Sequence, residues 1–253
     1  MSKTQTQTID YGKGSTFKIL LKLAPPVMLA QLIQALYNIV DSFFIGRYSE
    51  AGLTALSIIY PIQLLMIAFG VGTGVGINTL MAHYMGIGRK HKSDECAGTA
   101  AALGISMWII FAAVCFFIMP AYARMSTTSP EVIKLVTSYG RIVCTFSIGL
   151  FCESVWTKVL QAEGDMRTPM IAQIVGAIVN IILDPILIWG VGFVPKLGIS
   201  GAAIATVIGQ TAAAAIVMPK GFRHTPKLWK YPSYLKKIYH LGFPNILMPV
   251  SYT

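Results

Sequence analysis

Long runs of apolar residues separated by short polar segments dominate this chain. A run of about 18 or more apolar residues can cross a membrane, because about 20 residues at a rise of about 1.5 Å span a hydrocarbon core of about 30 Å. Six spanning helices are therefore expected, over residues 17–45, 53–85, 94–122, 131–160, 168–191 and 197–218. A seventh is expected to begin near Ile238 and to be cut short at Thr253. The pattern predicts an all-α fold, a polytopic transmembrane helix bundle.

Composition supports a membrane protein and argues against a nucleic-acid-binding one. The chain is 55% hydrophobic and 12% charged, with a mean hydropathy of +0.64, whereas soluble domains are about a quarter charged. The net charge is +10, but the basic residues lie in short segments between apolar runs, where they determine topology. Nucleic acid is therefore not expected as a partner. No organic cofactor or metal cage is visible, and the sequence contains no CxxC motif.

The distribution of basic residues predicts the orientation of the chain. Lysine and arginine concentrate before the first expected helix and in every second connection, and such segments stay in the cytoplasm. Residues 1–16 are expected to form a cytoplasmic tail, and residues 17–218 a six-helix unit. Residues 219–237 are expected to be a basic linker on the cytoplasmic face, followed by the start of the truncated seventh helix at 238–253. The expected location is a cell membrane, crossed several times.

Small residues are dense in two of the expected helices, in GVGTGVG (70–76) and GAAIATVIGQTAAAA (201–215). Such residues let helix backbones approach closely in lipid. We therefore expect these segments to pack tightly against neighbouring helices.

Two of the expected helices carry polar stripes inside apolar sequence. Spacings of three, four or seven residues place side chains on one face of an α-helix. The stripe on 17–45 consists of Gln31, Gln34, Asn38 and Asp41, with Tyr37 at its edge, and the stripe on 168–191 consists of Gln173, Asn180 and Asp184. Two helices thus carry the same arrangement, with an asparagine preceding an aspartate.

The two aspartates are the strongest candidates for a functional site. Both helices should run from the cytoplasm outward, which puts Asp41 and Asp184 at similar depth. An ionisable group at the centre of a spanning helix costs about 2.5–3.5 kcal/mol on insertion scales, so it usually faces a cavity or a partner. Burial disfavours the charged carboxylate, which suits a group that takes up and releases a proton. The structural alternatives are an Asp41–Arg47 pair and a bond from Asp184 to backbone freed by Pro185.

Other polar residues give weaker signals. Tyr139 could donate a hydrogen bond into a polar cavity or lie in an interfacial aromatic belt. Thr206 and Gln210, one turn apart, could line the same space or bond to a neighbouring helix. Glu153 and Lys158 are expected near the inner surface, as a structural pair.

Enzyme chemistry is not expected. The chain has no Walker A motif, and GVGTGVG follows no strand and lies inside a spanning segment, so it is not a nucleotide-binding loop.

Four segments resemble the successive signatures of multidrug and toxic compound extrusion (MATE) transporters. They are LAPPVMLAQLIQALYNIVDSFFIGR, MAHYMGIGRKHKSDECAG, LQAEGDMRTPMIAQIVGAIVNIILDPILIWG and LGISGAAIATVIGQ. The resemblance implies a twelve-helix antiporter of two six-helix lobes, which exports cationic or amphipathic drugs and toxic compounds against an inward proton or sodium gradient. This chain is similar to the N-terminal lobe, so the C-terminal lobe is a missing partner.

The resemblance also implies a cation site, carried over to Asp41, Tyr37, Tyr139, Asn180 and Asp184. The implied coupling ion is H⁺ or Na⁺, with Asp41, Asn180 and Asp184 as possible sodium ligands. Gln34, Asn38, Gln173, Thr206 and Gln210 are candidates to line the cavity. Two other functions stay open. One is a lipid-linked oligosaccharide flippase of the same superfamily, which the acid-bearing stripes disfavour, and the other is a truncated membrane protein that does not transport.

Overall fold

The computed structural model is a bundle of α-helices, and it describes residues 16–192, 194–223, 225–227 and 230–251. The helices are α1 (Thr16–Tyr48), α2 (Glu50–Gly86), α3 (Lys90–Ser126), α4 (Pro130–Thr145), α5 (Ile148–Ala162), α6 (Arg167–Trp189), α7 (Ile199–Gly221) and α8 (Tyr231–Ser251). Five of them, α1, α2, α3, α6 and α7, are long and apolar enough to cross a membrane, and the bent pair α4 and α5 can form a sixth span. The expected all-helical transmembrane bundle is confirmed. Within the expected N-terminal tail, only Thr16 belongs to the described residues.

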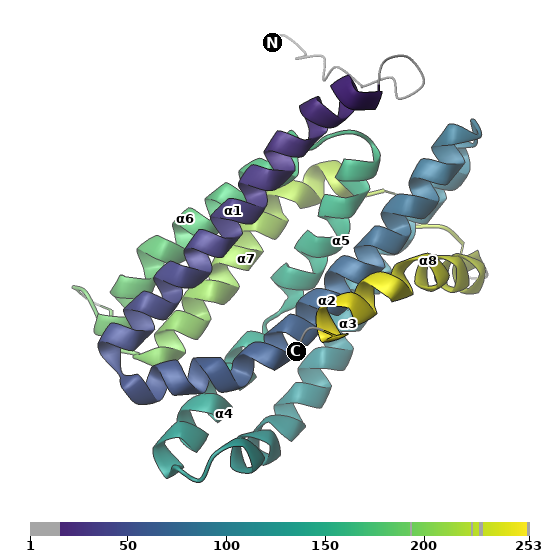
Figure 1. Ribbon diagram of the computed structural model, residues 1–253. Helices are drawn as coiled ribbons and strands as arrows, with labels where there is room; N and C mark the ends of the chain where they lie inside the picture. The colour runs from purple at the N-terminus through teal and green to yellow at the C-terminus, as the bar shows by residue number, and fades with distance from the viewer. Residues whose placement is uncertain (1–15, 193, 224, 228–229, 252–253) are drawn as a thin grey trace.

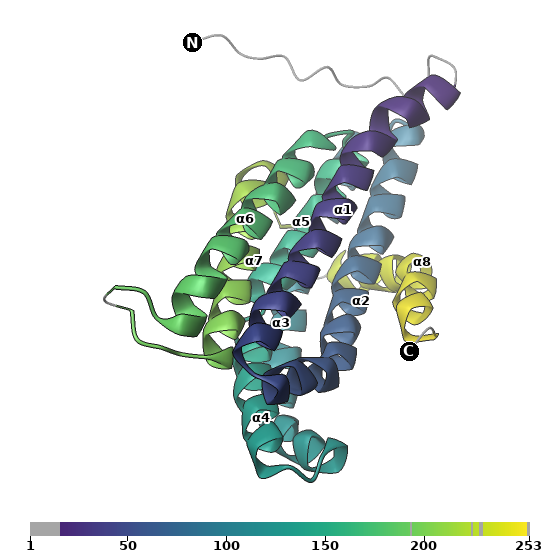
Figure 2. The same ribbon diagram turned by 60° about the vertical axis from the view of Figure 1, so that its left-hand side comes forward.

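The helices pack so that α5 lies inside the bundle and α1 lies on its outside. Figure 1 shows α1 lying along α6 and α7, and α5 contacts α2, α3, α6 and α7. Figure 2 shows α8 leaving the bundle on the side of α2. The most apolar window of α1 is only 11% buried, compared with 50% for that of α7. Helix α1 is therefore the least buried of the long helices.

The single helix expected over 131–160 is instead two helices, which meet at an angle of 45°. The break falls at Phe146 and Ser147, where a backbone inside the bundle needs other hydrogen-bond partners. Ser147 Oγ donates to the Cys144 carbonyl at 2.7 Å, and Trp108 Nε1 donates to the Thr145 carbonyl at 2.8 Å. These two side chains satisfy carbonyl groups at the break, and Gly149 follows it in the first turn of α5.

The linker expected over 219–237 is shorter than the sequence pattern indicates. Helix α7 continues to Gly221, and α8 begins at Tyr231 rather than near Ile238. The reason is that the polar residues here contact α3. Tyr234 donates to Glu95 Oε2 at 2.7 Å, and Lys230 forms an ion pair with the same carboxylate. Polarity in this segment therefore reflects contacts with the bundle as well as exposure.

Helices α2 and α8 cross at glycines. A Cβ added at Gly76 would overlap the Ile238 carbonyl oxygen, and one added at Gly242 would overlap the Gly72 carbonyl oxygen. The obstructing atoms belong to the backbone, so a flexible side chain cannot move aside to make room. The expected close packing of the GVGTGVG segment is thus observed against α8.

We predict that Gly76→Ala destabilises the protein by about 1–3 kcal/mol, the usual cost of overpacking. The added methyl group forces α8 away from α2. The matched control is Gly86→Ala, because no atom lies within 4 Å of a Cβ at that position of the same helix. Thermal unfolding of the purified protein in detergent measures the difference. Equal unfolding temperatures for the two variants would contradict this account of the α2–α8 contact.

Candidate functional site

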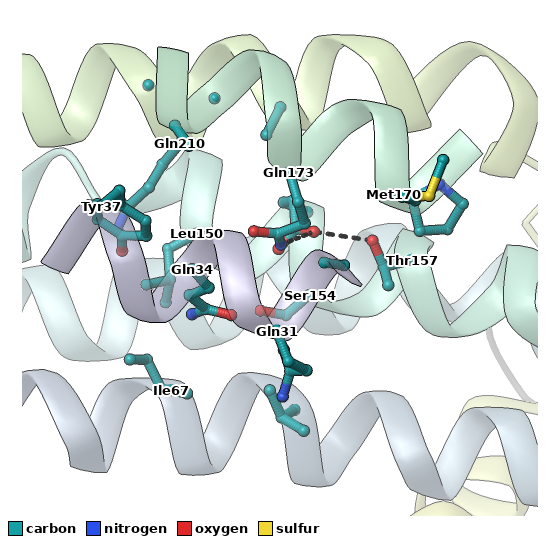
Figure 3. Close-up of a pocket in the computed structure, with 18 of the residues that line it drawn as sticks. Gln31, Gln34, Tyr37, Ile67, Leu150, Ser154, Thr157, Met170, Gln173 and Gln210 are labelled. Atoms are coloured by element: carbon teal, nitrogen blue, oxygen red, sulfur yellow. Dashed lines mark hydrogen bonds between the residues drawn. The ribbon is translucent and has the colours of Figure 1, made fainter. Parts of the chain in front are cut away.

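A cavity of about 180 Å³ lies between α1, α2, α5, α6 and α7. Figure 3 shows Gln34 and Tyr37 of α1 beside the same space as Gln173 and Gln210. Six residues predicted from the sequence line it: Gln34, Tyr37, Gln173, Asn180, Thr206 and Gln210. The two polar stripes therefore face one another across a cavity.

Asp41 and Asp184 do not line this cavity but lie buried beside Asn180. Asp41 is 6% exposed and Asp184 is 0% exposed. The two carboxyl groups lie close enough to interact electrostatically. Asn180 Nδ2 is 3.5 Å from Asp184 Oδ1 and 3.5 Å from Thr206 Oγ1. The structure thus brings together the two carboxyl groups that the sequence placed at similar depth.

Three buried oxygen atoms in this group have no hydrogen-bond partner. They are Asp41 Oδ1, Asn180 Oδ1 and Asp184 Oδ2. A buried polar atom without a partner costs about 1–3 kcal/mol, and more when it is charged. Carboxylate and amide oxygens are also the ligands that hard cations take in proteins. The residues present therefore fit either protons or a sodium ion.

The packing of α6 against α7 positions Asn180. Gly176 and Gly209 lie on facing surfaces, and a Cβ on either would come within 3.0 Å of the other's carbonyl oxygen, at 2.9 and 2.7 Å. One turn beyond Gly176, this close approach brings Asn180 against Thr206. Side chains larger than glycine would separate the two helices and remove that contact.

Both candidate tyrosines lie close to the aspartates. Tyr139 is 1% exposed, which excludes a place in an interfacial aromatic belt. Its hydroxyl group lies within hydrogen-bonding range of Thr206 and Gln63. Tyr37 is close enough to interact electrostatically with Asp41, Asp184 and Glu153.

Asn38 does not join the site, contrary to the expectation from its spacing. Its side chain is exposed, and it does not line the cavity. Gln31 and Gln34, which share its helix face, do line the cavity, so helical spacing by itself does not account for the exposure of Asn38. The alternative pairing of Asp41 with Arg47 is also not formed, since the Arg47 guanidinium lies 5.4 Å from the centroid of the Phe43 ring.

The sequence analysis did not predict that Glu153 lines the cavity. Thr157 Oγ1 donates to Glu153 Oε1 at 2.8 Å, and Gln173 Nε2 donates to the same oxygen at 2.7 Å. Lys158, the expected partner of Glu153, instead donates to Gln161 Oε1 at 3.0 Å. One signal was available, because Gln173 shares a helix face with Asn180 and a buried glutamine needs a partner.

The chain is similar in sequence to several known proteins. The chain is 28% identical to the probable multidrug resistance protein YoeA of Bacillus subtilis, over 82% of this chain and 45% of that protein. It is 27% identical to an FAD transporter of Shewanella oneidensis, over 79% of this chain and 44% of the relative. It is 25% identical to the multidrug export protein MepA of Staphylococcus aureus, over 96% of this chain and 55% of that protein. The chain thus spans about half the length of these relatives.

Solved structures share the fold. A transporter of the MOP superfamily from Pyrococcus furiosus, described as having a binding pocket of reverse polarity, superposes with a TM-score of 0.87 at 24% identity and covers 98% of this chain and 56% of its own. An outward-facing multidrug resistance MATE transporter superposes with a TM-score of 0.84 at 25% identity. The match covers 94% of this chain and 54% of that transporter. The family model MatE matches residues 26–186, more than half of the 253 residues. The chain belongs to the MatE family.

Proposed function

We propose that this chain forms the first lobe of a secondary antiporter that exports cationic or amphipathic drugs and toxic compounds in exchange for H⁺ or Na⁺. The observation that carries the proposal is the group of three buried oxygens without partners at Asp41, Asn180 and Asp184. A buried oxygen without a partner destabilises the folded protein. A cation bound there during part of a transport cycle would remove that cost.

Exchange would follow from the way α1 is held. Among the described side chains of α1, only Asp41 and Ile45 are buried, and Asp41 lies next to Asp184 of α6. Binding of a proton or sodium ion changes the charge of that contact, and a ligand shifts a conformational equilibrium by its different affinity for the two states. We propose that α1 rearranges on cation binding, and that the exported compound leaves outward as the lobes rock.

A second lobe is the partner we propose for the outer face of α1. That face carries large exposed apolar side chains, among them Leu32, Leu36, Ile39 and Phe43. The relatives in which this chain covers about half the length contain a further segment of similar size. We propose a multi-pass protein of the cell membrane with its N-terminus in the cytoplasm, a location that the positions of the basic segments support.

The charge of the cavity supports a drug or cation as the substrate over an oligosaccharide linked to lipid phosphate. Among the described residues that line it, the charged ones are Glu153 and Lys158. A flippase for an anionic lipid would favour a strongly cationic cavity. Transport assays with both classes of compound separate the two functions.

We predict that Asp41→Asn and Asp184→Asn each reduce energised efflux of ethidium to the level of cells that lack the protein. Each change preserves side-chain size while removing the group that would bind the coupling ion. The matched control is Glu131→Gln, which alters an exposed carboxylate at the start of α4 and should leave efflux unchanged. The assay is ethidium retention in an efflux-deficient bacterium expressing the full-length protein, with membrane insertion checked by immunoblot. Undiminished efflux by either variant would overturn the cation-site assignment.

We predict that the coupling ion lowers the affinity of the purified protein for the exported compound. Either a fall in pH or added Na⁺ should weaken ethidium binding, because occupation of Asp41 and Asp184 favours the state that releases substrate. Asp41→Asn should still bind ethidium but lose this sensitivity. Fluorescence titration in detergent, with choline replacing Na⁺, identifies which ion acts. Affinity independent of both ions in the unaltered protein would argue against antiport.

A further inference from the structure

We infer that Glu153 is the side chain that holds the positively charged group of the exported compound, an inference that rests on the proposed export function. Glu153 lines the cavity, whereas Asp41 and Asp184 do not. It is therefore placed to meet a molecule in the cavity, while the aspartates are placed to meet a smaller ion. In this assignment Glu153 binds the exported compound, and Asp41 and Asp184 bind the coupling ion.

The surface of α5 confirms that Glu153 is accessible. Between Phe151 and Leu160 every residue is buried except Glu153 and Lys158, and both of these line the cavity. Over this stretch, the only side chains of α5 that stay partly exposed are these two charged ones. A charge inside a spanning bundle is costly and marks a substrate path more often than a structural contact.

The carboxylate is fixed in orientation with one oxygen left for a ligand. Thr157 and Gln173 both donate to Oε1, so neither occupies Oε2. The two donors come from α5 and α6, so packing between helices holds the carboxylate in place. A side chain held by such hydrogen bonds is preorganised and loses little freedom when a cation binds.

Lys158 does not neutralise this carboxylate by direct contact. Its ammonium group donates to Gln161, which is eight residues beyond Glu153 toward the end of α5. Its stem packs against α2, where a Cβ at Gly74 would lie 2.7 Å from Lys158 Cγ. The ion pairs found among the described residues do not join Lys158 to Glu153.

The remaining wall of the cavity suits a lipophilic cation. Ile67, Leu150 and Met170 supply apolar surface, and Figure 3 shows them around the same space as Tyr37. A methionine adapts to ligands of different shape, and an aromatic ring attracts a cation through its face. The combination of a carboxylate, a phenol ring and adaptable apolar side chains fits organic cations of varied shape.

The Glu153 site is separate from the aspartate pair. Its hydrogen-bond partner Gln173 precedes Asp184 by eleven residues on α6, which corresponds to about 16 Å along the helix. Tyr37 lies close to the acids of both sites. Substrate and coupling ion can therefore occupy different positions in one lobe while remaining within electrostatic range.

Two ligands that differ mainly in charge provide the test, which uses the purified full-length protein in detergent. Tetraphenylphosphonium carries a permanent positive charge, and triphenylphosphine oxide is a neutral molecule of similar chemistry. Glu153→Gln should weaken tetraphenylphosphonium binding roughly tenfold, because it removes one charge at close range, and should change binding of the neutral molecule much less. The matched variant Lys158→Gln alters the other charge of the cavity and should strengthen tetraphenylphosphonium binding. Glu153→Asp, which retains the charge, should recover most of the lost affinity.

The outcomes distinguish this inference from the export function itself. If the unaltered protein exports and binds tetraphenylphosphonium, and Glu153→Gln binds it equally well, Glu153 does not hold the cation. Equal loss of both ligands, together with a lower unfolding temperature, would show a structural role and would also overturn the inference. If the unaltered protein neither binds nor exports organic cations, the proposed export function fails, and this inference fails with it.

Discussion

Polar groups in the interior of this bundle must find partners on neighbouring helices, because a membrane interior offers little water to bind them. Most of the interior obeys this constraint. Ser147 and Trp108 bind carbonyls at the α4–α5 break, and Thr157 and Gln173 bind Glu153. Among the described residues five buried side-chain oxygens lack a partner, one each of Asp41, Thr145, Asn180, Asp184 and Gln210. Those of Asp41, Asn180 and Asp184 lie together in one site, which fits a shared ligand better than three separate defects in packing.

Close approach of helix backbones sets the positions of these polar groups. The contact of Gly176 with Gly209 holds α6 on α7 and brings Asn180 to Thr206. Helix α1 is held differently, because little of its surface is buried. The site therefore combines a closely packed wall with one helix, α1, that carries Asp41 and buries little of its surface in this lobe. Such an arrangement is compatible with movement of α1 when the charge at Asp41 changes.

Helical periodicity could predict much of the site from the sequence. Because residues three, four or seven apart share a face, periodicity placed Gln173, Asn180 and Asp184 on one face of their helix and Asp41 on a polar face of another. The grouping of Asp41 with Asn180 and Asp184 was implied by the family resemblance. Periodicity does not show how far a cavity extends along a helix, and the side chain of Asn38 is exposed although Gln31 and Gln34 on its face line the cavity. Periodicity also does not show where a helix breaks.

The position of Glu153 depends on that break. With 131–160 taken as one helix, Glu153 was assigned to the inner surface, together with Lys158. The bend of 45° between α4 and α5 changes the course of the second half, which contacts α2, α3, α6 and α7. The basic residues after Gly221 suggested a linker as far as residue 237, whereas α8 begins at Tyr231. Their hydrogen bonds to α3, as at Lys230 and Glu95, cannot be inferred from local polarity.

The spacing of the two acidic sites offers a physical basis for exchange. Two positive charges about 16 Å apart repel by roughly 1 kcal/mol at an effective dielectric constant of about 20. This corresponds to a change in affinity of roughly fivefold. A cation at Asp41 and Asp184 would therefore weaken binding of an organic cation at Glu153, and by linkage the organic cation would weaken binding of the ion equally. Electrostatic repulsion within one lobe can thus make the two ligands compete without sharing any atom, and movement of α1 can add to that competition.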